Sequence, residues 1–155
     1  MTISVFKAAK RICELGNWKV TNLQLQKVLY LAEIVYLGRN NGTPLIDSDF
    51  EAWSYGPVNP ELYKATKMFG AGPIKDFFYG MEDLDRNSPE NKHLEDAWDK
   101  LGNVASWRLV SATHRNNGAW AKHYKSKCYG IKIPKEDMYE EYKMVNERGR
   151  KTEAA

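Results

Sequence analysis

Residues 50–58 read Phe50-Glu51-Ala52-Trp53-Ser54-Tyr55-Gly56-Pro57-Val58, and this stretch decides the fold around it. Its alternating side chains with two large aromatics predict a short, half-buried strand over Phe50 to Tyr55. Gly56 can adopt a positive φ and Pro57 has a fixed φ, so this pair is expected to end the strand in a sharp turn. Asn59-Pro60 then predicts an N-cap with proline at the first helical position. By itself, such a strand-turn-helix corner is more typical of a scaffold than of a functional site.

Upstream of this corner, one long apolar helix is expected at the centre of the fold. Thr21 and Gln24 form the Ser/Thr-x-x-Glu/Gln capping box that opens a helix. Apolar residues then cover most of the helical circumference as far as Gly38: Leu25, Val28, Leu29, Leu31, Ala32, Val35 and Tyr36. After a dense turn signal, Leu45-Ile46 is expected to form a short strand that pairs with Phe50 to Tyr55.

Spacing of apolar residues and capping signals predict five further helices. They span Val5 to Cys13 with Gly16 as C-cap, Glu61 to Met68, Pro89 to Leu101 after the N-cap Ser88, Trp107 to Thr113 with Trp107, Val110 and Ser111 on one face, and a last helix opened by Pro134. Between the second and third of them, Asp76 to Ser88 is expected to be a loop whose aromatics, Phe77, Phe78 and Tyr79, return to the core.

Together these elements predict a mainly α (α+β) fold: a single compact helical domain with a small antiparallel β element of two or three short strands. The domain is expected to span residues 1–148, and residues 149–155 to form a flexible C-terminal tail. We expect Trp53, Tyr55 and Trp120 to pack around the Gly56-Pro57 corner.

The composition is that of a soluble globular protein of 155 residues, with 43% hydrophobic and 28% charged residues. Cys13 and Cys128 are the only cysteines, and no secretory pattern accompanies them, so a cytoplasmic protein with free thiols is expected. The apolar run of the central helix is too short for a membrane span. Cys13 lies on the apolar face of its helix, where a thiol behaves as a small hydrophobe.

Charge is distributed unevenly along the chain. Lys and Arg outnumber Asp and Glu 6 to 2 over residues 1–46, are outnumbered 12 to 6 over residues 47–107, and lead 11 to 6 over residues 108–155. These segments carry net charges of +4, −6 and +5. The acidic block can pair internally with the basic ends, or leave surfaces of opposite sign.

No residue pattern indicates catalysis, and neither a metal nor a cofactor is expected. His114, His123 and Cys128 lack a recognised ligand spacing, and the chain has no Gly-x-Ser-x-Gly elbow, phosphate loop or dinucleotide fingerprint. His114 ends a predicted helix, where capping of the last carbonyls explains it better than catalysis. The basic run Lys122 to Lys127 contains an aromatic, as single-strand nucleic-acid surfaces do, but such runs are usually solvated.

Three motifs occur in order along the chain: Leu23 to Ala32, residues 50–58, and Leu109 to His114 followed by Trp120. They are similar to an L-Q-K-L-L-Y-x-A helix, an E-A-W-x-Y-G-P-V signature and a T-H block before tryptophan, and with them the chain resembles the Panacea domain family of GepA-like and SocA-like antitoxins. The resemblance covers about Val20 to Tyr124. It implies a structural or toxin-binding role for Gln26, Lys27, Tyr30, Glu51, Ala52, Trp53, Tyr55, Gly56, Pro57, Val58, Tyr63, Thr113, His114 and Trp120.

Two positions depart from the family pattern. Ala119 stands where proline often precedes the final tryptophan, and Arg115 stands where an acidic residue often follows the T-H pair. These departures concern the geometry of that loop and any partner contact there, while the fold expectation is unaffected.

The resemblance implies a non-enzymatic antitoxin that binds a cognate toxin, which is expected to be encoded by the adjacent gene. One alternative is an adaptor that delivers a partner to an ATP-dependent protease. Another is a nucleic-acid-binding regulator of an operon or phage, although nucleic acid is the less favoured partner because the net charge is only +3. Ala154-Ala155 is either a frayed end or a degradation tag. The toxin, its binding surface and the oligomeric state stay open.

Overall fold

The computed structural model describes residues 2–154 of the chain. It is mainly helical with one small antiparallel sheet, which confirms the predicted fold class. The elements follow in the order α1 (Val5–Leu15), α2 (Asn22–Arg39), β1 (Phe50–Trp53), β2 (Gly56–Val58), α3 (Pro60–Thr66), the 3-10 turn η1 (Lys67–Phe69), α4 (Pro89–Leu101), α5 (Ser106–Thr113), α6 (Ala119–His123), β3 (Lys132–Ile133) and α7 (Lys135–Ala154). The short helix α6 was not predicted from the sequence.

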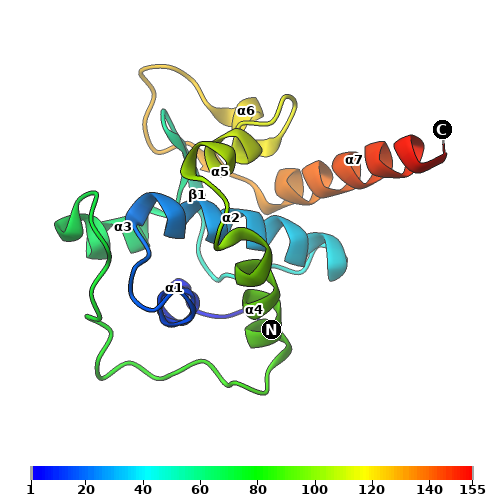
Figure 1. Cartoon of the computed structure of the whole chain (residues 1–155). Coiled ribbons are helices and arrows are strands. Elements are labelled where there is room, and N and C mark those ends of the chain that lie inside the picture. The colour runs from blue at the N-terminus through cyan, green and yellow to red at the C-terminus, as the bar shows by residue number, and fades with distance from the viewer. Residues whose placement is uncertain (1, 155) are drawn as a thin grey trace.

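Helix α2 lies at the centre of the molecule, as its apolar circumference predicted. Its N-cap is Thr21, whose hydroxyl oxygen accepts a hydrogen bond from the backbone N–H of Gln24 at 3.3 Å. Helices α1, α4, α5 and α7 all pack against it, and Figure 1 shows them arranged around it. Most of the surface of α2 is therefore covered by other elements, and even its polar side chains Gln26, Lys27 and Glu33 are buried. Leu23 and Arg39 near its two ends are exposed.

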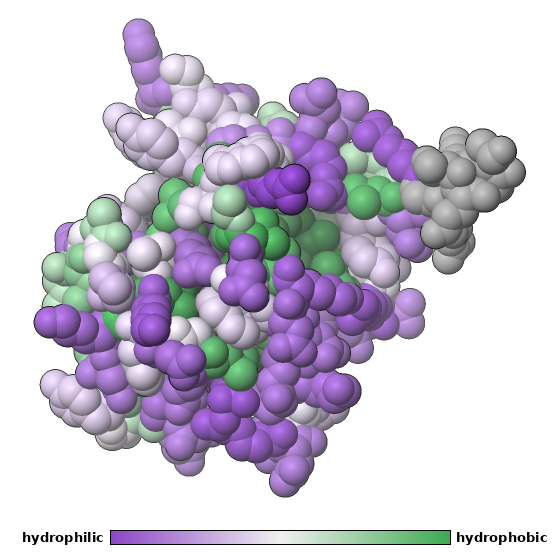
Figure 2. Space-filling model, in the orientation of Figure 1, coloured by the Kyte–Doolittle hydropathy of each residue, from purple (hydrophilic) through white to green (hydrophobic). Residues whose placement is uncertain are grey.

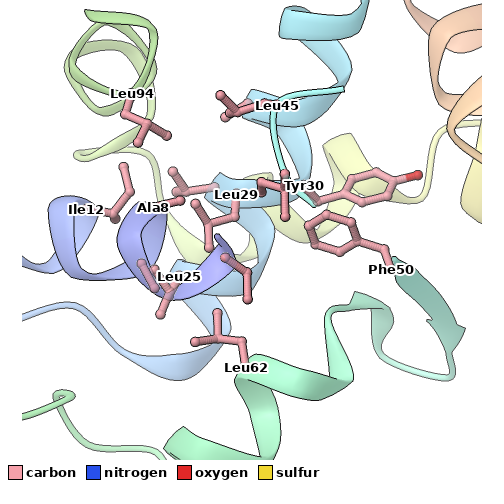
Figure 3. Close-up of a cluster of buried hydrophobic side chains, with 14 of the residues drawn as sticks. Ala8, Ile12, Leu25, Leu29, Tyr30, Leu45, Phe50, Leu62 and Leu94 are labelled. Atoms are coloured by element: carbon pink, nitrogen blue, oxygen red, sulfur yellow. The ribbon is translucent and has the colours of Figure 1, made fainter. Parts of the chain in front are cut away.

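The core gathers side chains of α1, β1, α3 and α4 around α2 (Figure 3), and Ile133 and Met138 join it from the C-terminal part of the chain. Burying one leucine or isoleucine side chain contributes about 2 kcal/mol, so this cluster is the main source of stability. Cys13 lies in the same cluster, and burial raises the pKa of its thiol to about 12, so the thiol stays protonated. The fully buried members that Figure 3 labels are Ala8, Ile12, Leu25, Leu29, Tyr30, Leu45, Phe50, Leu62 and Leu94.

The sheet differs from the expectation in two respects. Gly56 and Pro57 do not end the strand; they form β2 themselves, which pairs with β1 so that Glu51 lies opposite Val58 and Trp53 opposite Gly56. The turn lies between β1 and β2, at residues 54–55. Proline is tolerated here because β2 is an edge strand in the order β2-β1-β3.

The predicted pairing of Leu45-Ile46 with the strand at residue 50 is also wrong. Ile46 instead forms an isolated parallel bridge with Ile3 near the N-terminus, while β1 receives β3 as its second partner. The N-cap beyond β2 is confirmed, because the side chain of Asn59 accepts a hydrogen bond from the backbone N–H of Leu62 at 3.1 Å.

Tyr79, which was expected to return to the core, lies on the surface, and so does Trp107, which was expected on one face of its helix with Val110 and Ser111. Phe78 returns to the core from the loop before α4 as predicted, but the neighbouring Tyr79 is 82% exposed. On α5 the buried side chains are Leu109 and Thr113, whereas Trp107 points outward and is 67% exposed. Tyr79 directly follows the buried Phe78, and Trp107 lies two residues before the buried Leu109, so the direction of each side chain and not its hydrophobicity decided which one was buried.

The basic N-terminal segment pairs internally with part of the acidic block. Lys10 Nζ lies 2.6 Å from Asp83 Oδ1, and Arg86 on the same loop lies 3.2 Å from Glu14 on α1. The loop that carries these charges runs past α1 to reach α4 (Figure 1). Because most of these groups are partly exposed, each pair contributes about 1 kcal/mol or less. The pairs orient the loop more than they stabilise the domain.

Helix α7 packs closely on α2 through a glycine. A Cβ at Gly38 would lie 2.1 Å from the ring of Tyr142, so only glycine permits this approach. No helix within residues 2–154 is long and apolar enough to cross a membrane. Ala155 and the side chains of residues 149–154 lie outside the described residues, so the expected tail over 149–155 and the Ala154-Ala155 tag stay expectations.

Candidate functional site

The first two motifs meet where α2 holds the β hairpin. Lys27 donates a hydrogen bond from Nζ to the backbone carbonyl of Pro57 at 3.0 Å. Next to it, the amide of Gln26 accepts from the backbone N–H of Asn59 at 2.8 Å and donates to its carbonyl at 3.2 Å. Both side chains are buried. The polar residues of the helix motif thus bind the backbone of the strand motif, and they join two elements that lie 30 residues apart.

Gly56 is the contact point of all three motifs. Its φ is +117°, a conformation that favours glycine. A Cβ at this position would lie 2.9 Å from Lys27 Nζ and 3.0 Å from His114 Nε2. The chain therefore needs glycine here for its backbone conformation and also for space, because an ammonium group and an imidazole ring both approach the backbone.

The third motif packs on this corner through stacked rings. His114 stacks on Trp120 with ring centroids 4.0 Å apart, and Trp120 stacks on Tyr124 at 4.9 Å. The indole N–H of Trp120 donates to the carbonyl of Trp53 at 2.8 Å, which ties this stack to β1. The expected capping by the His114 side chain is replaced by stacking, although the His114 backbone N–H does cap α5.

Burial and the nearby charge of Lys27 lower the pKa of His114, burial being the larger cause. A neutral imidazole is thus favoured beside the ammonium group.

The remaining buried motif residues serve the core. Tyr30 packs edge-on against Phe50 with ring centroids 5.2 Å apart, and burial raises the pKa of its phenol, so the ring stays neutral. The Thr113 hydroxyl donates to the carbonyl of Val110 at 2.8 Å inside α5. The motif's two small apolar residues, Ala52 and Val58, are buried on β1 and β2.

Four motif residues lie at the outer edge of the corner. Trp53 is half-buried, donates its indole N–H to Glu51 Oε1 at 2.9 Å, and packs edge-on against Tyr63 at 5.2 Å. Tyr55 at the turn is 82% exposed, so the expectation that it packs around the corner is wrong. Trp53 and Trp120 do pack there. The edge of the corner thus presents aromatic surface, whereas its interior is polar.

The sequence did not reveal Glu141 on α7, which contacts both positions that depart from the family pattern. Its Oε1 accepts a hydrogen bond from the backbone N–H of Ala119 at 2.7 Å, and its Oε2 lies 3.7 Å from Arg115. Burial raises the pKa of Glu141, and the two contacts oppose that rise. A proline at residue 119 would lack the N–H, so Ala119, Arg115 and Glu141 form one matched set.

Glu33 was missed in the same way. This fully buried carboxylate of α2 accepts hydrogen bonds from the backbone N–H groups of Leu45 at 2.7 Å and Ile46 at 3.2 Å, and it pairs with Lys135. The sequence did contain a signal for Glu33, because a carboxylate on the buried side of a mostly apolar helix requires a hydrogen-bonding or charged partner. Among the described side chains of residues 2–148, no group of three His, Cys, Asp or Glu is arranged to hold a metal ion.

The burial of Lys27 predicts a pH dependence of stability. Burial lowers its pKa to about 8 from the usual value near 10.5. Between these two values the unfolded chain binds more protons than the folded one, so stability rises with pH. Relative to Lys27→Met, the wild-type free energy of unfolding should increase by about 2 kcal/mol from pH 7 to pH 10. Urea denaturation of both proteins at each pH measures this difference, and a constant difference would contradict a buried ammonium.

The outer aromatics predict unequal effects on stability. Trp53→Ala should lower the free energy of unfolding by about 1.5 kcal/mol, because a half-buried ring loses its contacts with Tyr63 and Glu51. Tyr55→Ala at the neighbouring exposed turn is the matched control and should change it by less than about 0.5 kcal/mol. Thermal and urea unfolding of both variants measure this, and equal losses would show that exposure does not separate the two rings.

Comparison with known proteins gives one family and one curated relative. The model of the family described as "Antitoxin SocA-like, Panacea domain" matches residues 25–121, which include the second and third motifs and the first motif from Leu25 onward. Antitoxin SocA of Caulobacter vibrioides (strain NA1000 / CB15N) is 31% identical over 110 residues, a stretch that covers 65% of this chain and 58% of that protein. No solved structure matches the chain.

Proposed function

Because the chain belongs to the family of SocA-like antitoxins with a Panacea domain, we propose that it neutralises a cognate toxin protein by binding it directly. The match of the family model over residues 25–121 carries this proposal. The partner we expect is the product of the adjacent gene, and the complex is expected to form in the cytoplasm. On this proposal the protein acts by occupying the toxin and not by catalysing a reaction.

The geometry of the corner supports a binding protein. A catalytic acid or base must reach a substrate within hydrogen-bond distance. Lys27 is only 2% exposed and donates to a backbone carbonyl, and Gln26 is engaged in the same way with Asn59. These groups hold the hairpin on α2. We therefore propose a scaffold role for the motif interior, and a contact role for surfaces outside it.

Co-expression with the adjacent gene tests the proposal. Induced alone, the product of that gene should stop growth; induced with this protein, it should not, and the two should elute together in size-exclusion chromatography. The matched control is a Gly56→Val variant, whose unfolding removes the antitoxin without altering the toxin. A neighbour that is harmless alone, or equally toxic with and without this protein, would contradict the proposal.

Two further measurements separate the alternatives. An adaptor would shorten the half-life of the partner, and only when an ATP-dependent protease is active; direct neutralisation leaves the half-life unchanged. A nucleic-acid regulator would shift operator DNA at about 50 mM salt and lose affinity steeply toward about 200 mM. Direct binding predicts neither result.

A further inference from the structure

A groove with a volume of about 310 Å³ opens between α2, α4, α5 and α7, away from the Gly56 corner. Its floor and walls are mainly apolar. In Figure 2 it appears as a recessed green area with purple side chains around it, below α5 and beside the start of α7. Half-buried apolar side chains from four helices line it: Leu31 and Val35 of α2, Ala97 and Leu101 of α4, Ala112 of α5, and Tyr142 and Val145 of α7.

These side chains are half-buried, so each one packs partly against the core and is partly exposed to solvent. A mainly apolar hollow of about 310 Å³ with a few polar groups around it has the size and lining of a binding pocket. The groove is bordered by the sides of helices, and an amphipathic helix that places residues i, i+4 and i+7 on one face fits such a border.

The charges around the groove are mostly positive, and two of them are unpaired. Arg39 is the last residue of α2, and Lys100 lies near the end of α4. A hydrogen bond from the Gln24 side chain to the carbonyl of Gly102 holds this end of α4 beside the start of α2. Neither cation forms an ion pair among the side chains that the structure describes, those of residues 2–148. They therefore flank the groove toward opposite ends.

The acidic residues of the groove are already neutralised. Asp96 lies 3.7 Å from Lys92, one turn earlier on α4, and the carboxylate of Glu141 contacts Arg115 and the backbone of Ala119. Helical spacing also places Arg108 on the same face of α5 as Ala112, and Arg115 lies just beyond the end of this helix. The potential over the groove is thus positive, which favours an acidic partner.

We propose that this groove docks an amphipathic helix of the cognate toxin, with apolar side chains in the groove and acidic residues flanking them toward Arg39 and Lys100. The proposal rests on the proposed function, since it names the surface by which the toxin is bound. It assigns direct neutralisation to α2, α4, α5 and α7, and it leaves the Gly56 corner as the support of that surface.

A designed helical peptide of about 18 residues tests the chemistry of the groove without the toxin. One fluorescent version carries leucines along a single face with glutamates beside them, and the other carries lysines in place of the glutamates. The acidic peptide should bind the full chain at least about tenfold more tightly than the basic one. Equal binding, or binding of neither peptide, would overturn the proposal.

Substitutions in the groove give the second readout. Ala112→Trp fills the groove from α5 and should weaken acidic-peptide binding at least about tenfold, whereas Ser111→Trp on the exposed side of the same helix should not. Arg39→Glu with Lys100→Glu should weaken it similarly, and Lys64→Glu with Lys67→Glu on α3 and η1 is the charge-matched control. Circular dichroism and thermal unfolding verify that each variant is folded, and loss of binding in the controls would overturn the proposal.

Co-expression then separates this inference from the proposed function. Protection by wild type but not by Ala112→Trp supports both. Protection by both proteins means that the toxin binds elsewhere, which overturns the groove while neutralisation stands. If the adjacent gene product is harmless, the proposed function fails, and the assignment to a toxin helix fails with it even where the acidic peptide binds.

Discussion

Replacing Glu33 with alanine is expected to lower the free energy of unfolding by about 4 kcal/mol, because a buried carboxylate with three partners is lost. The backbone N–H groups of Leu45 and Ile46 would remain buried without an acceptor, at about 1–3 kcal/mol each. Lys135 would lose the anion that pairs it with α2. Urea denaturation at neutral pH measures the effect.

A graded series identifies the cause. Glu33→Gln keeps one oxygen acceptor and loses the charge, so it should fall between wild type and Glu33→Ala. Glu61→Ala removes an exposed carboxylate from the first turn of α3 and should change stability by less than about 0.5 kcal/mol. If Glu33→Ala were as mild as Glu61→Ala, the carboxylate would not hold residues 45–46 on α2.

Replacing Gly56 with alanine is expected to lower the free energy of unfolding by about 3 kcal/mol. The φ of +117° is strained for any residue with a Cβ, at about 1–3 kcal/mol. The new methyl group would also displace Lys27 Nζ, whose hydrogen bond to Pro57 contributes about 1.5–3 kcal/mol because the donor is charged. Since Lys27 is buried, its ammonium group has no solvent to move into.

Gly130 separates these two causes. Its φ is also positive, at +71°, but nothing lies within 4 Å of the position of its Cβ. Gly130→Ala therefore carries backbone strain alone and should cost about 1 kcal/mol. Equal losses in the two variants would mean that the approach of Lys27 and His114 to Gly56 has no energetic consequence.

Local signals in the sequence predicted the starts of the helices well. Thr21, Asn59 and Ser88 each cap the helix that was expected after them, with the side chain accepting a backbone N–H from within the next three residues. Capping involves only neighbouring residues, so its chemistry is visible in the sequence. The apolar circumference of α2 likewise predicted its central position, because only a helix surrounded on all sides can bury such a surface.

One error concerns a hairpin, and the other concerns contacts between more distant segments. Gly56 and Pro57 were expected to end a strand, because glycine and proline usually do so; pairing with β1 and the edge position of β2 override that tendency. Leu45-Ile46 was expected to pair with the nearest strand, but the buried carboxylate of Glu33 binds its backbone and Ile3 pairs with it instead. The partner of Gly56-Pro57 is the neighbouring strand β1, whereas nothing near Leu45-Ile46 in the sequence indicates Glu33 and Ile3 as its partners.

The sequence by itself determined the family, the helical fold class and the central helix, because motif order, capping and periodicity are properties of neighbouring residues. Only the tertiary structure decided why Gly56 must be glycine, that Ala119 and Arg115 share Glu141, and that four helices leave an apolar groove flanked by Arg39 and Lys100. Each of these depends on side chains that are brought together from segments 22 or more residues apart. Such contacts arise from the packing of whole elements, which local sequence patterns do not encode.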